Sequence, residues 1–131
     1  MRLFQLILSS LLWFSFPNLE EVNKDSIDPV VSAIESGSSS DLAKYFNPSI
    51  SLNVNGQQGE YSKNQAEIVL RDFFKKNPPG GFSLVFRSEN PTSLSTYIGE
   101  YASGPGSYKV FIKVSQQDNS FLIYSLDFVK T

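Results

Sequence analysis

The stretch EYSKNQAEIVLRDFFKKNPP, residues 60–79, contains the start, body and end of one amphipathic helix. Ser62 and Gln65 have the spacing of a capping box, in which each side chain accepts a hydrogen bond from a backbone N–H of the first turn. Pro78 and Pro79 end the helix. One face of this helix is apolar, because its apolar residues recur at helical spacing: Ala66, Val69, Leu70, Phe73 and Phe74. Such a helix must lie on a broad apolar surface.

The opposite side of the same helix carries charges. Glu67 with Arg71, and Asp72 with Lys76, are spaced as i,i+4 ion pairs in the favourable orientation. A solvated helix face explains these charges without a binding partner.

Short helices and strands are predicted on both sides of this helix. Asp28 followed by Pro29 predicts a helix start, and Asn47-Pro48 predicts a break before a strand at residues 49–54. Asn55-Gly56 predicts a hairpin turn into a second, short strand. After the central helix, alternating apolar residues predict four further strands, at residues 82–87, 95–102, 108–114 and 122–128. Helices first and consecutive antiparallel strands afterwards predict an α+β fold, with the helices on one face of the sheet.

The register of the last two strands follows from burial of their apolar faces. Matching these faces pairs three apolar positions across the strands, Val114 with Leu122, Ile112 with Tyr124 and Val110 with Leu126. The same register predicts Lys109 opposite Asp127 on the outer face.

Composition restricts the function. The 131 residues fit one domain, with a net charge of −2 and neither histidine nor cysteine. Without these residues, histidine bases, thiol nucleophiles, disulfides and most zinc or iron sites are excluded. The acidic net charge argues against a nucleic-acid partner. Carboxylates at metal-binding spacing and phosphate-binding loops are also missing, so we expect neither metal nor cofactor.

The N-terminal residues read as a leader. Residues 3–16 are mostly apolar and uncharged, and they are too few to span a bilayer as a helix, which argues against a stable membrane anchor. We therefore expect a signal peptide at residues 1–17, a polar linker at 18–26 and a single domain at 27–131. The protein would then be exported, to the periplasm or the medium. The alternative is a buried N-terminal helix of a cytosolic domain.

Three stretches carry a resemblance that covers much of the chain: SAIESGSSSDLAKYFNPSISL at residues 32–52, residues 60–79, and YIGEYASGPGSYKVFIKV at residues 97–114. They resemble a family of small exported bacterial proteins of unknown function within the nuclear transport factor 2-like superfamily. The resemblance implies a cone, with a curved antiparallel sheet and helices on its concave face. It also implies a funnel-like cavity and dimerisation through the sheet face, which would make the protein a homodimer. It implies no activity, because the superfamily includes isomerases, dehydratases and non-catalytic binding domains.

The strand at residues 95–102 can present either of two faces to the interior. If Ile98 and Glu100 point inward, Glu100 lies among aromatic rings and is a candidate base. If Tyr97 and Tyr101 point inward, Glu100 is solvated. We favour the second arrangement, because burying an unpaired carboxylate is costly. Gly99 indicates a bulge or bend between the two.

Three hypotheses about function follow. The first is a non-catalytic exported domain that binds a small apolar or aromatic ligand, or a protein partner, through candidate lining residues Tyr45, Tyr97, Tyr101, Tyr108 and Tyr124. The second is a carboxylate-dependent isomerase or dehydratase that uses Glu100 and a pocket tyrosine. In the third, the protein's own rings fill the pocket, and an exposed apolar patch around Phe111 and Ile123 makes the outer sheet face the functional surface.

Overall fold

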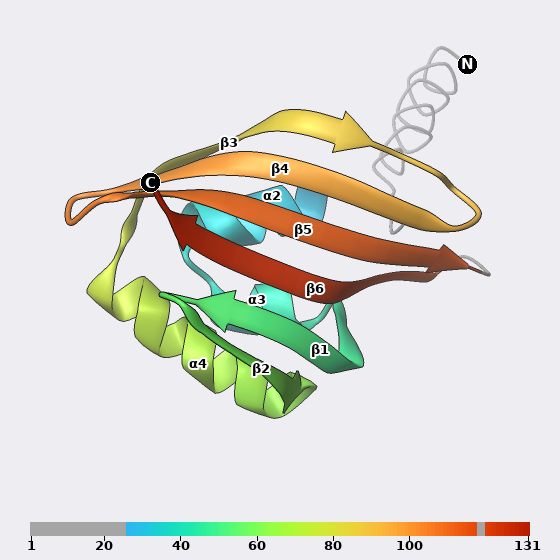
Figure 1. Cartoon of the computed structure of the whole chain (residues 1–131), viewed down its shortest axis with the longest axis horizontal. Coiled ribbons are helices and arrows are strands. Elements are labelled where there is room, and N and C mark those ends of the chain that lie inside the picture. Colours follow the sequence, from blue (N-terminus) through green and yellow to red (C-terminus); the bar gives the residue numbers. More distant parts are fainter. Residues whose placement is uncertain (1–25, 118–119) are drawn as a thin grey trace, which may run out of the picture.

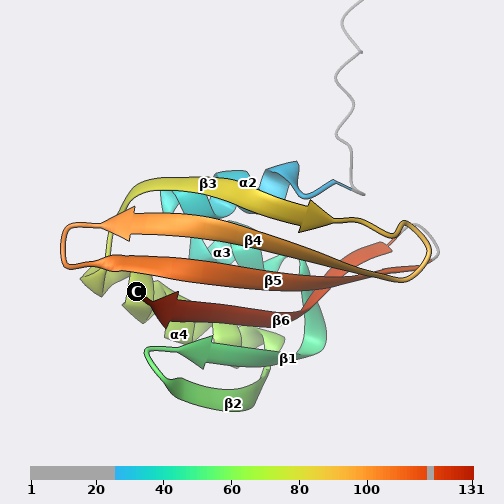
Figure 2. The ribbon, with the colours of Figure 1, turned by 45° about the horizontal axis from the view of Figure 1, so that its top comes forward.

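The computed structural model describes residues 26–117 and 120–131, and these form one curved sheet with helices behind it (Figure 1). The turned view shows the described helices on the same side of the sheet (Figure 2). In chain order the elements are α2 (Asp28–Ser36), α3 (Ser39–Ala43), β1 (Phe46–Val54), β2 (Gln57–Ser62), α4 (Lys63–Lys76), β3 (Pro79–Ser88), β4 (Leu94–Ser103), β5 (Ser107–Gln117) and β6 (Ser120–Lys130). The α+β architecture expected from the sequence is confirmed.

Helix α4 forms as its sequence predicts. The Gln65 backbone N–H donates to Ser62 Oγ at 3.2 Å, and the Ser62 N–H donates to Gln65 Oε1 at 3.3 Å, which completes the capping box. Ion pairs join Glu67 to Arg71 at 3.4 Å and Asp72 to Lys76 at 3.2 Å on the exposed side. The predicted apolar face packs inward, with four residues buried and Val69 half-buried against the core: Ala66, Leu70, Phe73 and Phe74.

The first of the two short helices begins one residue earlier than predicted. The carbonyl of Ile27 accepts the first helical hydrogen bonds of α2, so Ile27 rather than Asp28 is the N-cap. Gly37, at φ 68°, ends this helix in the left-handed conformation. Ser38 caps α3 by accepting a hydrogen bond from the Asp41 N–H at 3.2 Å.

The hairpin signal at Asn55-Gly56 is confirmed. Both residues have positive φ, 56° and 78°, which is the geometry of a type I′ turn, and Val54 pairs directly with Gln57 across it. The break predicted at Asn47-Pro48, ahead of a strand beginning at residue 49, is placed too late in the chain. β1 starts at Phe46 and passes through the proline, where its pairing with the neighbouring strand is irregular.

The sheet has the strand order β2-β1-β6-β5-β4-β3. Neighbouring strands are antiparallel, except that β1 and β6 run parallel. An antiparallel sheet was expected throughout, so the parallel pair of β1 and β6 is a correction. It arises because the chain crosses from β2 through α4 to the opposite edge, returns strand by strand, and ends beside β1.

A β-bulge at Tyr124 changes the predicted register of β5 and β6. The structure pairs Lys113 with Ser125 and Val114 with Ile123, which leaves Tyr124 as the extra residue. The three predicted apolar pairs are therefore wrong, and so is the pairing of Lys109 with Asp127, which lies opposite Phe111 instead. Strict alternation would put Phe121 and Ile123 on one face of β6, and Leu126 and Phe128 on the other. The extra residue at the bulge lets all four side chains face the core.

In β4 the tyrosines face the core, as favoured from the sequence. Tyr97 and Tyr101 are buried, whereas Glu100 is exposed. Gly99 does not interrupt the alternation; a Cβ at this position would lie 2.5 Å from the ring of Phe82, so the glycine makes room for that ring. The irregularity lies in the neighbouring strand β3, next to Leu84.

Candidate functional site

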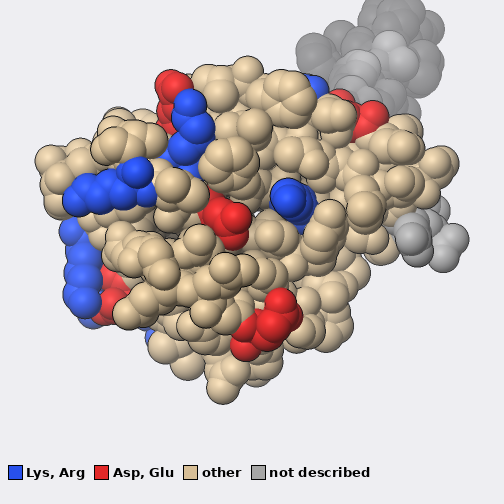
Figure 3. Space-filling model, viewed as in Figure 1, with Lys and Arg blue, Asp and Glu red and all other residues tan. Residues whose placement is uncertain are grey.

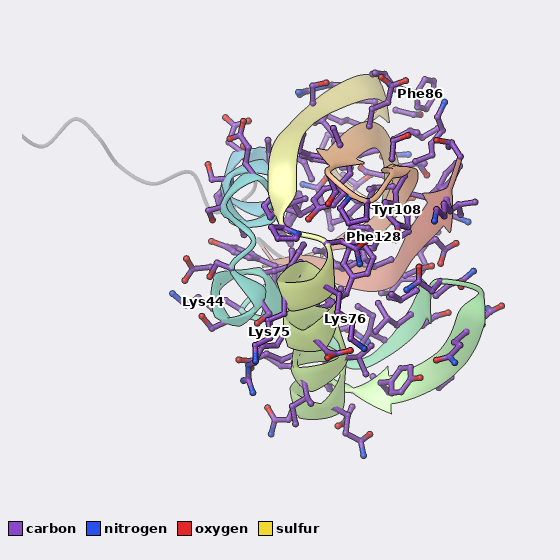
Figure 4. All side chains as sticks on the ribbon, turned by 90° about the vertical axis from the view of Figure 1, so that its left-hand side faces the viewer. Lys44, Lys75, Lys76, Phe86, Tyr108 and Phe128 are labelled. Atoms are coloured by element: carbon purple, nitrogen blue, oxygen red, sulfur yellow. The ribbon has the colours of Figure 1, made fainter. Side chains whose placement is uncertain are left out.

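The concave side of the sheet is filled by aromatic rings. Phe73 of α4 lies at its centre, with ring centroids 4.8 Å from Phe128 and 5.1 Å from Tyr108. Tyr101 and Phe74 extend the cluster. Figure 4 shows Tyr108 and Phe128 between the sheet and α4. The protein's own side chains therefore occupy this part of the cone, which the sequence suggested as a ligand pocket.

The tyrosine hydroxyls of this cluster bind the end of α4. Tyr101 donates to the backbone carbonyl of Asn77, and Tyr108 lies within hydrogen-bond distance of Asn77 Oδ1 at 3.2 Å and Asn55 Oδ1 at 3.3 Å. Asn77 is buried and also donates to the carbonyl of Phe73. Burial, and then repulsion from Tyr108, raise the pKa of Tyr101 well above its usual value. These hydroxyls act as structural donors that join α4 to the sheet.

Tyr97 lies further along the sheet. Its ring packs near Phe121 and its hydroxyl donates to Glu89 at 2.8 Å, while Arg87 lies 3.5 Å from the same carboxylate. Burial first, and the hydrogen bond to Glu89 second, raise the pKa of Tyr97. This hydroxyl therefore also keeps its proton.

The two remaining candidate tyrosines lie elsewhere. Tyr45 is half-buried and borders an open hollow of about 310 Å³ between α2 and α3, together with Pro29 and Lys44. Tyr124 is the bulge residue of β6, where it is partly exposed. The structure thus brings Tyr101 and Tyr108 together but does not gather all five tyrosines around one cavity. Their role in ligand binding stays a prediction.

Glu100 is on the outer face of β4, with 60 % of its side chain exposed, and its carboxylate lies 3.9 Å from Lys109 Nζ. It borders an open hollow of about 710 Å³ whose lining also includes the candidate residues Tyr101 and Tyr108. The arrangement with Glu100 inside the cone is wrong, because β4 turns its tyrosines inward. A solvated carboxylate paired with lysine lacks the apolar environment of a buried base, so the isomerase or dehydratase hypothesis has no support.

Within the described ranges, 26–117 and 120–131, three or more acidic, histidine or cysteine side chains nowhere gather as they would around a metal ion. In the same ranges, no helix combines the length and the hydropathy needed to cross a membrane.

The outer face of the sheet exposes apolar side chains that helices do not cover. We call Val85, Phe86, Ile98, Phe111 and Val129 the outer patch. Val85 is 53 % exposed, Phe86 49 % and Val129 43 %, while Ile98 and Phe111 are half-buried. Figure 3 shows this face with few charged groups among wide uncharged areas.

Strand register explains how the outer patch is built. Phe86, Ile98 and Phe111 lie side by side on β3, β4 and β5 in one row across the sheet. The third hypothesis placed Ile123 in this patch, which is wrong, because the bulge at Tyr124 leaves Ile123 buried on the inner face.

Charged groups flank this row. Glu100 and Lys109 form the next pair along β4 and β5, and Asp127 of β6 lies directly opposite Phe111. Burial raises the pKa of Asp127, and nearby Lys113 partly opposes the change. Asp127 also pairs with Asn53 on β1, whose buried Oδ1 has no hydrogen-bond partner among the described residues.

Sequence reasoning named only Phe111 among the members of the outer patch and missed the other four, of which Ile98 and Phe86 are instructive. Ile98 could have been found, because it alternates with Tyr97 and must point outward when the tyrosine points inward. Phe86 could not, because the irregularity beside Val85 reverses the alternation of β3 without a local sequence signal.

Comparisons with known proteins place these observations in a family. Residues 27–129 match the family described as "Domain of unknown function (DUF4783)". A crystal structure of a DUF4783 family protein from Bacteroides ovatus ATCC 8483 is 26 % identical, with a TM-score of 0.76 over 82 % of this chain and 97 % of that one. One from Bacteroides uniformis ATCC 8492 is 22 % identical, with a TM-score of 0.75 over 79 % and 95 %.

More distant solved structures show the wider fold. An NTF2-like protein of unknown function from Silicibacter pomeroyi DSS-3 is 15 % identical, with a TM-score of 0.60 over 80 % of this chain and 89 % of that one. No curated protein matches the chain. The resemblance suggested by the three sequence stretches is thus confirmed: the chain belongs to the DUF4783 family and has an NTF2-like fold.

Proposed function

We propose that this domain is a non-catalytic protein-interaction module that forms a homodimer through the outer face of its sheet. One observation carries the proposal: aromatic rings fill the concave side, whereas the outer patch exposes several large apolar side chains. Monomeric soluble proteins rarely leave a contiguous apolar patch of this kind without a partner.

A second copy of the chain fits this face because the face is self-complementary. Ile98 lies opposite Phe111, and Glu100 lies opposite Lys109, on the neighbouring strands β4 and β5. A two-fold axis in the interface, running between these strands, would set Ile98 of each subunit against Phe111 of its partner. It would also set each Glu100 against a Lys109, so apolar and charged contacts would both be matched.

The face is also of suitable size. β3 to β6 have ten or eleven residues each, so the four strands cover about 19 Å by 33 Å, or roughly 600 Å² in projection. The accessible area of a surface with side chains exceeds its projection. Stable interfaces bury roughly 800 Å² on each partner, which this face can supply.

The oligomeric state of Phe111→Asp tests the proposal. We expect the unaltered domain to sediment as a dimer at about 10 µM and the variant as a monomer, because a buried carboxylate without a partner opposes association. Ile68→Asp is the matched control, since Ile68 is 57 % exposed on α4, away from the sheet. Circular dichroism checks that both variants fold. A monomeric unaltered domain, or a Phe111→Asp dimer, would contradict the proposal.

Exchanging the charges tests the orientation of the two copies. Lys109→Glu should weaken the dimer, because the new carboxylate would lie against Glu100 of the other subunit. Adding Glu100→Lys to the same chain should restore association, because the exchange re-creates each charged contact with its sign reversed. A double variant no better than the single one would exclude this axis.

We also propose that the domain is exported, which the apolar, uncharged run at residues 3–16 supports. Cleavage near Pro17 would remove Trp13, the single tryptophan of the chain. The protein recovered from the periplasm or medium of its source should therefore show tyrosine but no tryptophan fluorescence. A full tryptophan signal, or recovery from the cytoplasm alone, would contradict export.

A further inference from the structure

The turn between β1 and β2 has a chemical property that the fold does not use. Asn55 and Gly56 form this turn, both residues are exposed, and Figure 2 shows the turn at the edge of the sheet. An asparagine side chain can react with the backbone that follows it. The nitrogen of the next residue attacks the amide carbon Cγ, and a succinimide ring closes. The rate depends on which residue comes next and on how firmly its nitrogen is held.

Three of the other asparagines in the described part of the chain cannot react in this way. Asn47, Asn77 and Asn90 each precede a proline. The proline nitrogen carries no hydrogen, so it cannot lose a proton and attack the side chain. The reaction is therefore limited to asparagines that precede another residue type.

The two remaining asparagines besides Asn55 are held by secondary structure. Asn53 lies within β1 and precedes Val54, whose branched side chain crowds its own backbone. Asn64 lies in the first turn of α4 and precedes Gln65, whose N–H donates to Ser62 Oγ at 3.2 Å. Ring closure at either position would distort a strand or a helix, so we expect both to react slowly.

The nitrogen that follows Asn55 is open to reaction. Glycine has no Cβ, and even a Cβ added to Gly56 would meet nothing within 4 Å beyond its chain neighbours. The turn also lies where the sheet ends, and such exposed segments open locally at less cost than a buried strand. Local opening lets the Gly56 nitrogen approach Asn55 Cγ. Among the described asparagines, Asn55 is thus the one best placed to react.

We propose that Asn55 is a site of spontaneous deamidation, in which the chain modifies itself through the backbone nitrogen of Gly56. Hydroxide removes the Gly56 N–H proton, the nitrogen bonds to Asn55 Cγ, and the side-chain nitrogen leaves as ammonia. Water then adds to one of the two ring carbonyls and breaks its bond to the ring nitrogen. The product is aspartate or isoaspartate, and no atom changes its oxidation state. The reaction does not depend on the proposed dimer.

The modification reaches the aromatic interior through Tyr108. The Tyr108 hydroxyl has a single proton and lies near two acceptors, Asn55 Oδ1 at 3.3 Å and Asn77 Oδ1 at 3.2 Å. A carboxylate accepts a hydrogen bond more strongly than an amide does. Aspartate at this position would therefore draw the proton away from Asn77, at the end of α4. Isoaspartate would lengthen the backbone of the turn instead.

Peptide mapping of the aged, folded domain tests the proposal. The domain is kept at pH 9 for several days and then cleaved with trypsin after Lys44 and Lys63, which separates Asn55 from Asn64. We expect the peptide with Asn55 to gain the mass difference between a hydroxyl and an amino group, and fragment ions to locate the change at Asn55. The reaction should be at least about tenfold faster there than at Asn64, because glycine lacks the Cβ that crowds ring closure. Its rate should rise in proportion to hydroxide.

Two variants isolate the chemistry. Gly56→Ala places a Cβ beside the attacking nitrogen and should slow the change at Asn55. Because its φ of 78° disfavours alanine, amide spectra check that this variant folds. Asn55→Asp needs no such allowance, since Asp-Gly suits the same turn. It should release ammonia far more slowly than the unaltered domain, and it should shift the side-chain resonance of Asn77.

Three results would overturn the proposal: no mass change at Asn55, a rate no faster than at Asn64, or equal ammonia release from Asn55→Asp and the unaltered domain. A folded Gly56→Ala that reacts as fast as the unaltered domain would exclude attack by this nitrogen. An unchanged Asn77 resonance in Asn55→Asp would overturn the link through Tyr108.

Discussion

The two faces of β4, β5 and β6 use alternate residues of the same strands for different purposes. On the inner face, Tyr101, Tyr108 and Phe128 pack against Phe73, and both hydroxyls reach Asn77. On the outer face, Phe111 and Val129 remain partly or largely accessible. The inner residues make packing contacts and hydrogen bonds within the domain, while the outer ones are available to a partner.

This difference argues for caution in reading aromatic residues as a ligand site. Tyr101 and Tyr108 have the rings and hydroxyls of a binding pocket, yet α4 supplies Phe73 and Asn77 to fill the space and accept the hydrogen bonds. Composition identifies an aromatic interior but does not tell whether a ligand or a neighbouring helix occupies it.

Truncation of one phenylalanine on each face should give the largest contrast. Phe73→Ala leaves a cavity among buried rings and should lower the free energy of unfolding by roughly 3–5 kcal/mol. Phe111→Ala, measured on the monomer, should cost less than about 1 kcal/mol because the side chain is already half in water. Urea denaturation measures both. Equal losses would mean that the outer patch is part of the core.

Raising the pH above about 10, where an unfolded tyrosine ionises, should destabilise the inner face. The pKa values of Tyr97 and Tyr101 are raised in the folded state, so their contribution to stability is complete below that pH and is lost as pH rises toward the folded values. Melting temperatures from pH 8 upward check this. The double variant Tyr97→Phe, Tyr101→Phe should decline less steeply, and an equal decline would contradict the assignment.

Removing one hydroxyl tests the link between α4 and the sheet. Tyr101→Phe leaves the buried Asn77 carbonyl without this donor and should cost about 1–2 kcal/mol in unfolding free energy. Tyr124→Phe provides the control, because that tyrosine is partly exposed, and should change stability by less than about 0.5 kcal/mol. Chemical denaturation of the two variants side by side separates these cases.

The smallest effect is expected at Asp127. Its raised pKa means that the ionised carboxylate weakens the fold at neutral pH, and that this penalty declines as the pH falls from the folded value toward the unfolded one. Asp127→Asn should therefore be more stable at pH 7, by less than about 1 kcal/mol, and the advantage should be lost by about pH 4, where the unfolded carboxyl is also becoming protonated. Glu100→Gln should change stability at pH 7 by less than about 0.5 kcal/mol, because its pair with Lys109 is exposed. A less stable Asp127→Asn at pH 7 would contradict the reasoning.

The sequence predicted those features that depend on neighbouring residues. The capping box at Ser62, the turn at Asn55-Gly56 and the inward tyrosines of β4 each follow from a local pattern, and each is confirmed. The bulge at Tyr124 was not predicted, because it depends on burying apolar residues that lie both before and after it in β6. A chain that must bury Ile123 and Leu126 on one face needs an extra residue between them.

The candidate sites were harder to predict than the fold. The outer patch is the example: Phe86, Ile98 and Phe111 come together only through the register of three strands, which no local pattern encodes. Phe86 was missed for the same reason as Tyr124, since the interruption in β3 is set by its partner strand.

The parallel pairing of β1 with β6 has a consequence for the timing of folding. β1 has two neighbours in the sheet, and one of them, β6, leaves the ribosome after the other five strands of this sheet. The N-terminal half therefore cannot complete its core while synthesis continues, and the ribosome-bound chain stays unstructured for longer than one built from local contacts. For a chain that must be threaded through a translocation channel, as our proposal of export requires, this delay would keep it in a transportable state.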